Sequence, residues 1–233
     1  MAAPNIRSDY WQGVRAGFPF LLVIAPFGTL FGVLATEAGL NVFETLTFSV
    51  VVIAGAAQFV SLQMLQEHVP ALIVLASALA VNLRMAMYSA AITPHLGGMP
   101  LWKRALSAYF LIDQTYAASA LEFERHPEKT LPQKFAFFMG TMTPTCPPWY
   151  LFTLLGAWLG EAVPADFGLD FALPIAFLAM IAPALRSGAH VVAALVATVG
   201  ALLLAWVPYN LGVLAAAALG MMAGAETERR MQK

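Results

Sequence analysis

Charged side chains are scarce in this chain. Lys, Arg, Asp and Glu make up 11% of its 233 residues, against roughly 25% in ordinary soluble domains. The net charge of −1 gives no general attraction to polyanions. The composition therefore argues against nucleic acid as a partner.

Cysteine and clustered metal ligands are also lacking. Cys146 stands alone, which excludes an intrachain disulfide, and we interpret it as a buried thiol. The four histidines lie at predicted loops or helix ends: His68, His95, His126 and His190. No His-x-x-x-His, Gly-x-Ser-x-Gly or paired acidic motif occurs. We therefore expect no enzyme activity, no metal and no cofactor.

Apolar residues, in contrast, are abundant. They make up 60% of the chain, and the mean hydropathy is +0.75. Several apolar runs approach the twenty residues that a helix needs to cross a bilayer, where backbone groups must be satisfied internally. The sequence predicts an all-α, multi-pass integral protein of the cell (inner) membrane. No small-residue cleavage site follows the first run, which we interpret as a retained helix.

About eight spans are predicted, or seven if the last two form one hairpin around Pro208. They are Arg15–Thr36, Val42–Leu65, Pro70–Ile92, Leu101–Leu121, Phe135–Gly160, Phe171–Leu185, His190–Val207 and Tyr209–Gly224. We expect a single transmembrane domain over 1–233. It comprises a polar N-terminus at 1–14, a membrane region at 15–224 and a cytoplasmic tail at 225–233.

The distribution of Lys and Arg sets the expected orientation. With the N-terminus inside, nine of the twelve basic residues are cytoplasmic, and Arg84 is intramembrane. Lys103 and Arg104 fall outside, against the rule. They indicate that the fourth span, Leu101–Leu121, is not necessarily a simple crossing.

A weak internal repeat accompanies this layout. Phe31–Ala56 is similar to Leu155–Ala184, although chance similarity between helices rich in Ala, Leu and Gly is an equal alternative. If the fourth span crosses, the two halves point the same way. If it does not, they are inverted.

Proline and glycine interrupt two of the spans near their middles. Pro26 and Gly28 lie in the first span, and Pro144, Pro147 and Pro148 lie in the fifth. Proline removes a hydrogen bond from the helical ladder. Breaks at matching positions of two halves indicate a transporter binding site. Simple kinks or close helix packing are the alternatives.

Two opposite charges lie inside predicted spans. An ionised side chain at that depth costs several kcal/mol unless it is paired or faces water, so it marks a candidate pathway. Arg84 shares a helix face with Tyr88, and Asp113 shares one with Tyr109 and Tyr116. Asn82 lies about 200° from Arg84 around a regular helix.

A zwitterionic amino acid could replace an Arg84–Asp113 pair. Arg84 would bind the carboxylate in a bidentate manner. Asp113 would take the ammonium group or a coupling proton. The alternative is a permanent structural ion pair. Gln58 offers a neutral polar contact to substrate, although hydrogen bonding between helices is the more usual role.

Several motifs in order resemble the AzlC family, the large subunit of bacterial branched-chain amino acid exporters. The stretches are PFGTLFG (Pro26–Gly32), VIAGAAQF (Val52–Phe59), NLRMAMYSAAITP (Asn82–Pro94), IDQTY (Ile112–Tyr116) and the segment from LGAWLG to GLDFALPIAFLAM. The resemblance implies export of Leu, Ile and Val, with Met as a further candidate, driven by the proton motive force. It also implies a separate small membrane subunit of the AzlD type.

Two positions depart from what the resemblance leads us to expect. Met85 follows Arg84 where a His is expected, and Gln114 follows Asp113 where a Glu is common. The second departure leaves Asp113 as the sole acidic candidate in that span. The alternative function is a permease for another small organic acid or amino acid that works without a partner. Arg84 alone would suffice for an organic acid.

Overall fold

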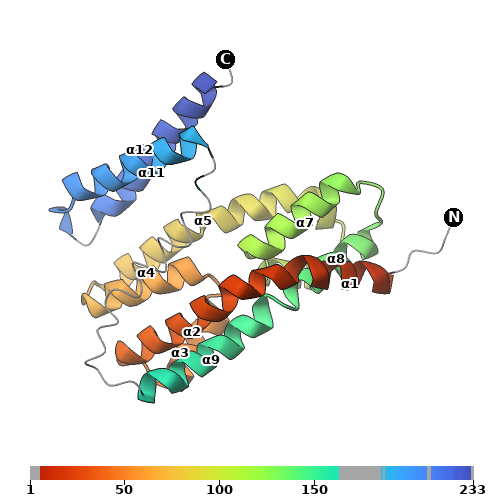
Figure 1. The fold of residues 1–233 in the computed structure, drawn as a ribbon, viewed down its shortest axis with the longest axis horizontal. Coiled ribbons are helices and arrows are strands. Elements are labelled where there is room, and N and C mark those ends of the chain that lie inside the picture. The colour runs from red at the N-terminus through yellow and green to blue at the C-terminus, as the bar shows by residue number, and fades with distance from the viewer. Residues whose placement is uncertain (1–5, 163–184, 186, 209–210, 232–233) are drawn as a thin grey trace. The chain divides into compact units, whose positions relative to one another are not determined.

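The computed structural model describes residues 6–162, 185, 187–208 and 211–231. The chain divides into two compact units, Met1–Gln66 with Ala78–Phe167 and Glu67–Ser77 with Gly168–Lys233. Within the described ranges all regular structure is helical (Figure 1). The all-α class is therefore confirmed. The single membrane domain stays a prediction.

Two described segments are long and apolar enough to cross a membrane. One is Ile6–Glu37, which comprises α1 (Ile6–Gly17), η1 (Phe18–Phe20) and α2 (Leu21–Glu37). The other is α5 (Ala71–Leu96). By length and composition these are candidate spans. The total of seven to eight spans and the orientation stay predictions.

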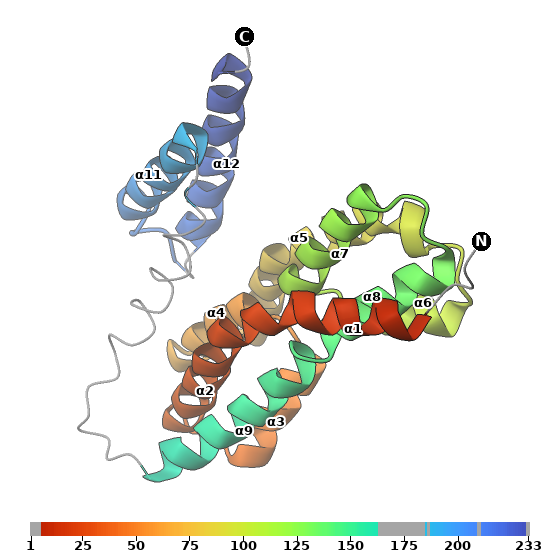
Figure 2. The same ribbon diagram turned by 45° about the vertical axis from the view of Figure 1, so that its right-hand side comes forward.

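Two interrupted helices run side by side in the larger unit. α1 and α2 lie against α8 (Leu131–Met142) and α9 (Cys146–Ala162). A Cβ on Gly13 would meet Phe137, and one on Gly17 would meet Thr141. Both partners lie 124 positions further on (137 − 13 and 141 − 17), so the two interrupted helices are parallel. Figure 2 shows them in the same direction.

This register agrees with the internal repeat expected from the sequence. The two similar stretches begin at Phe31 and Leu155, again 124 positions apart (155 − 31). Over the described residues the start of the repeat therefore corresponds to matched, parallel helices. Its second half falls on 163–184, outside the described residues, as does most of the predicted span Phe171–Leu185.

The expected span Val42–Leu65 is instead a helical hairpin. α3 (Val42–Val51) and α4 (Gly55–Gln66) are joined by a turn at residues 52–54. Phe48 and Phe59 both pack on Phe31, with ring centroids 5.7 and 5.5 Å from it. The chain therefore turns back beside α2. Helices of this length span roughly 15–18 Å, about half of a bilayer core. Hydropathy alone does not distinguish a hairpin of two short helices, which enters and leaves on the same side, from one helix that crosses the bilayer.

The expected span Leu101–Leu121 is a second hairpin. α6 (Leu101–Tyr109) and α7 (Asp113–Arg125) are joined by a turn at residues 110–112. α7 runs parallel to α5, because Tyr116 stacks on Tyr88 at 4.2 Å and Phe123 lies 5.3 Å from His95. α6 therefore runs from the end at which α5 finishes into the larger unit, and α7 runs back to that same end. The structure thus replaces the predicted fourth crossing by a hairpin.

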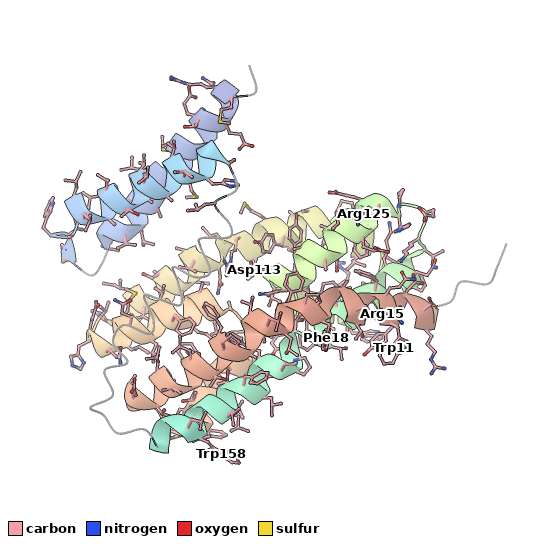
Figure 3. The ribbon with its side chains drawn as sticks, in the orientation of Figure 1. Trp11, Arg15, Phe18, Asp113, Arg125 and Trp158 are labelled. Carbon is pink, nitrogen blue, oxygen red and sulfur yellow. The ribbon has the colours of Figure 1, made fainter. Side chains whose placement is uncertain are left out.

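This second hairpin explains the basic residues that contradicted the predicted topology. Lys103 and Arg104 lie at the start of α6, at the same end of the larger unit as the beginning of α1. In Figure 3, Arg15 and Arg125 lie toward this end as well. Apart from Arg84, every Lys and Arg of the described larger unit lies in α1, in α6 or in the stretch from the last residue of α7 to the first turn of α8.

A buried charge cluster joins three elements at this end. Lys129 Nζ lies 2.7 Å from Asp9 Oδ1 and 2.6 Å from Glu122 Oε1. Burial lowers the pKa of Lys129, but its hydrogen bonds to the two carboxylates outweigh burial and leave the pKa above its usual value. Lys129 is therefore charged, and it ties α1 to α7 and to the segment before α8.

The described part of the smaller unit contains two further helices. α11 (Gly188–Leu203) and α12 (Leu211–Met231) are antiparallel, since Gly200 packs on Ala216 and Gly220 on Ala197. Small residues let the two backbones approach closely. Pro208 lies in the connection, as expected for a closing hairpin.

Candidate transport site

Arg84 and Asp113 form an ion pair in the larger unit. Arg84 Nη2 lies 3.2 Å from Asp113 Oδ2, and the two side chains are 30% and 41% exposed. Arg84 comes from the middle of α5, and Asp113 is the first residue of α7 (Figure 3). The predicted pairing is therefore present, although it arises between parallel helices rather than between two successive crossings.

The pair leaves hydrogen-bonding capacity unused. Arg84 Nε and Asp113 Oδ1 are buried atoms without a hydrogen-bond partner. The hydroxyl of Tyr88 interacts with Asp113, and Tyr88 stacks on Tyr116 with the rings 11° from parallel. These four side chains form one cluster, as the sequence predicted for Arg84, Tyr88, Asp113 and Tyr116. Because both unused atoms are buried, the ion pair would have to separate before a ligand that carries both charges could bind them.

The turns of the two hairpins meet. The Tyr109 hydroxyl donates to the Val50 carbonyl oxygen at 2.7 Å and lies 2.9 Å from the Tyr150 hydroxyl. The expected stripe of Tyr109, Asp113 and Tyr116 on one helix is therefore wrong for Tyr109, because the chain leaves the helix at 110–112. Tyr109 instead ends α6 and joins the first hairpin to α9.

Four helices begin at the interruptions inside the larger unit. α2 begins after η1, α9 begins after residues 143–145, and α4 and α7 begin at the hairpin turns. A helix N-terminus carries free amide hydrogens and partial positive charge. Asp113 is the first residue of α7 and therefore lies beside such free amides.

The predicted break at Pro26 and Gly28 is displaced in the structure. Pro26 lies inside the continuous helix α2 and is exposed, and the interruption is at η1 around Pro19. Proline is well tolerated at the start of a helix, so Pro19 favours a new beginning there. Gly28 is buried, and a Cβ there would lie 3.1 Å from Phe152 Cβ. Gly28 therefore lets α2 pack closely against α9.

The predicted break in the fifth span is present. Residues 143–145 separate α8 from α9 and include Pro144, whose Cγ would lie 2.8 Å from a Cβ on Gly17. The Tyr10 hydroxyl lies 2.8 Å from Thr143 Oγ1 across the two interrupted helices. The two breaks are therefore neighbours.

Gln58 belongs to a separate buried cluster. Its Nε2 donates to Ser49 Oγ at 2.9 Å, and Ser49 Oγ lies 3.1 Å from Thr153 Oγ1. This cluster holds the first hairpin against α9, which is the interhelical role considered for Gln58. Gln58 Oε1 has no partner. Asn82 is half-buried with Oδ1 unpartnered.

Sequence reasoning missed Tyr150, Ser49 and Thr153. Each is an ordinary residue of an apolar run, and its contacts lie far away along the chain: Tyr150 meets Tyr109, and Thr153 meets Ser49. A polar residue repeated every three or four positions was the available signal, and Ser49 with Thr45 provides it on α3.

The comparison with known families decides what the chain is. The family described as AzlC protein matches residues 19–163, more than half of the chain. The chain belongs to the AzlC family. The matched region begins inside η1, after α1, and covers α2, α8, α9, both hairpins and the Arg84–Asp113 pair.

Three relatives support a membrane protein. The inner membrane protein YgaZ of Escherichia coli K12 is 25% identical over 75% of this chain and 72% of its own length. A membrane protein of Archaeoglobus fulgidus is 29% identical over 90% of this chain and 91% of its own. A membrane protein of Helicobacter pylori is 24% identical over 74% of this chain and 75% of its own length. No solved structure matches. The family and these relatives point to a membrane transporter.

Proposed function

We propose that this AzlC protein is a secondary transporter that exports branched-chain amino acids, driven by the proton motive force. The observation that carries the proposal is the Arg84–Asp113 pair, which is half-exposed and retains one unused donor and one unused acceptor. A permanent structural pair gains most when every donor and acceptor is satisfied. An incompletely satisfied pair suits exchange with a zwitterion.

The roles follow from the charges. The guanidinium of Arg84 binds the substrate carboxylate through two parallel hydrogen bonds. Asp113 takes the ammonium group of the substrate or the coupling proton. Breaks in helices beside a central site are a recurring design in secondary transporters. The neighbouring breaks at η1 and at 143–145 fit this design and provide apolar surface for the aliphatic side chain.

The basic residues support an orientation with the N-terminus in the cytoplasm. The end of the larger unit that carries Arg7, Lys103, Arg104 and Lys134 would then face inward. Export of a zwitterion moves no net charge, so coupling to an entering proton would yield about 2.3 kcal/mol per 100 mV. The protein would lie in the cell membrane as a multi-pass protein.

We further propose a small membrane subunit of the AzlD type as the partner. Support comes from family membership and from the apolar surface of the described residues. Leu72, Leu75, Leu79 and Leu83 follow one another along α5 with 62–79% exposure. Lipid covers such a stripe in a lone chain, and a second membrane helix could cover it in a complex.

Transport assays in cells and in proteoliposomes test the proposal. Arg84→Ala and Asp113→Asn should each abolish tolerance to a leucine-containing dipeptide and reduce efflux of radiolabelled leucine at least tenfold. Membrane abundance should be unchanged. Arg229→Ala is a matched control, since Arg229 is exposed and pairs only within α12. Wild-type growth of both site variants on the toxic dipeptide would refute the assigned roles.

A further inference from the structure

A second cavity lies between α5 and α6, outside the Arg84–Asp113 cluster. Its volume is about 240 Å³, below the roughly 300–1,000 Å³ of pockets for drug-sized ligands. Ser89 and Thr93 line it from α5, Arg104 and Ser107 line it from α6, and Phe138 adds an aromatic ring from α8.

The polar groups of this cavity select for an anion. Among the described residues of the lining, Arg104 contributes the one charged side chain, and three hydroxyls accompany it. Ser107 is 7% exposed, and its Oγ is buried without a hydrogen-bond partner. A buried hydroxyl without a partner costs free energy, which a bound ligand would recover. No carboxylate lines the cavity, so an ammonium group would find no counter-charge.

The rest of the lining is aliphatic or aromatic. Ile92, Leu96 and Leu111 face the same space. A ligand that matches this environment has one anionic group and a short apolar body. A carboxylate suits the planar fork of Arg104, which donates two parallel hydrogen bonds.

We propose that this cavity is a binding site for a small monocarboxylate with a short apolar chain, distinct from the zwitterion site at Arg84. Occupancy would tether α6 to α5. Since Tyr109 at the end of α6 holds the Val50 carbonyl and the Tyr150 hydroxyl, the ligand would restrain the contact between the two hairpin turns. Cellular monocarboxylates could therefore modulate transport.

The test uses the full-length protein in phosphatidylcholine nanodiscs and titration calorimetry with 4-methylpentanoate, which is leucine without its ammonium group. Arg104→Gln should raise the Kd at least tenfold, equivalent to about 1.4 kcal/mol, and Ser107→Ala should raise it several-fold. Lys103→Gln is the matched control. Its Nζ lies over the rings of Trp102 and Phe135 and does not line the cavity, so the Kd should not change.

Two further arms separate this site from the transport site and from lipid. Arg84→Gln should leave 4-methylpentanoate binding intact, and 3-methylbutylamine, which lacks the carboxylate, should not bind. The proposal is overturned if Arg104→Gln binds like the wild type, or if binding is lost with Arg84→Gln instead. It is also overturned if phosphatidylglycerol competes with the acid through Arg104, since the site would then hold a lipid headgroup.

Discussion

At the scale of single residues, the Arg84–Asp113 pair has two properties that allow its role in substrate binding to be tested apart from its role in protein stability. Each partner neutralises the other at 3.2 Å, and each retains an atom without a partner. Removing one member leaves an uncompensated charge in a region of low polarity, whereas removing both leaves none. Stability and transport should therefore respond differently to single and double substitution.

The double variant makes this difference measurable. Arg84→Gln and Asp113→Asn should each lower the midpoint of thermal unfolding by a few degrees in detergent, because the remaining charge is unpaired. The double variant Arg84→Gln/Asp113→Asn should recover most of that loss, yet its leucine efflux should stay at background. A double variant that is less stable than either single one would contradict the pairing, and restored efflux would contradict the transport role.

Four residue positions show what the sequence could and could not predict. Arg84 and Asp113 were identifiable because an ionised group inside an apolar run is rare and costly. Tyr150 was not, because its hydroxyl acquires significance only through contact with Tyr109, 41 positions away. Pro26 gave a misleading signal. A helix can continue past a proline by losing one hydrogen bond, and here the chain is interrupted at Pro19 instead.

At the scale of elements, α2 and α9 pack with their backbones in close contact. Gly32 faces the Thr153 carbonyl and Gly156 faces the Thr29 carbonyl, so each glycine admits the backbone of the other helix. Both contacts lie roughly two to three helical turns beyond the interruptions that divide the two long helices. The glycines therefore hold α2 and α9 in register, and with them the starts of both helices.

Substitution of Gly156 tests this contact. A Cβ on Gly156 would collide with the Thr29 carbonyl oxygen, so Gly156→Ala should destabilise the protein by an amount on the order of 1–3 kcal/mol, as overpacking does elsewhere. Thermal unfolding of the purified protein measures the effect. Gly188→Ala is the control, because the nearest atom to its Cβ would be Met231 Sδ at 3.8 Å. Equal melting of the two variants would show that the α2–α9 contact is not close-packed.

The hairpins mark the limit of element prediction from sequence. Val42–Leu65 is apolar over the length of a span, and periodicity gives no sign that it divides at residues 52–54. Small residues run from Ala54 to Ala57 at this point, but their effect depends on Trp149, whose ring would lie 3.0 Å from a Cβ on Gly55. Lys103 and Arg104 carried the better clue, since they contradicted a simple crossing.

At the scale of the larger unit, the two hairpins are related in an inverted manner. Val42–Gln66 and Leu101–Arg125 each contain a helix, a three-residue turn and a second helix over 25 residues. One follows α2 and the other follows α5, which run in opposite directions. The hairpins therefore enter from opposite ends, and their turns meet at Tyr109 and Val50.

This arrangement predicts a topology different from eight crossings. Single cysteines at Phe43, Gln66, Gly98 and Glu124 report the ends of both hairpins, in a Cys146→Ser background that removes the buried native thiol. With the N-terminus inside, a membrane-impermeant maleimide should label Phe43→Cys and Gln66→Cys in intact cells. Gly98→Cys and Glu124→Cys should react only after permeabilisation. All four variants must react in permeabilised cells as the control. Labelling of Phe43→Cys and Gly98→Cys alone in intact cells would instead establish that both segments cross, because a single crossing places the two ends of each segment on opposite faces.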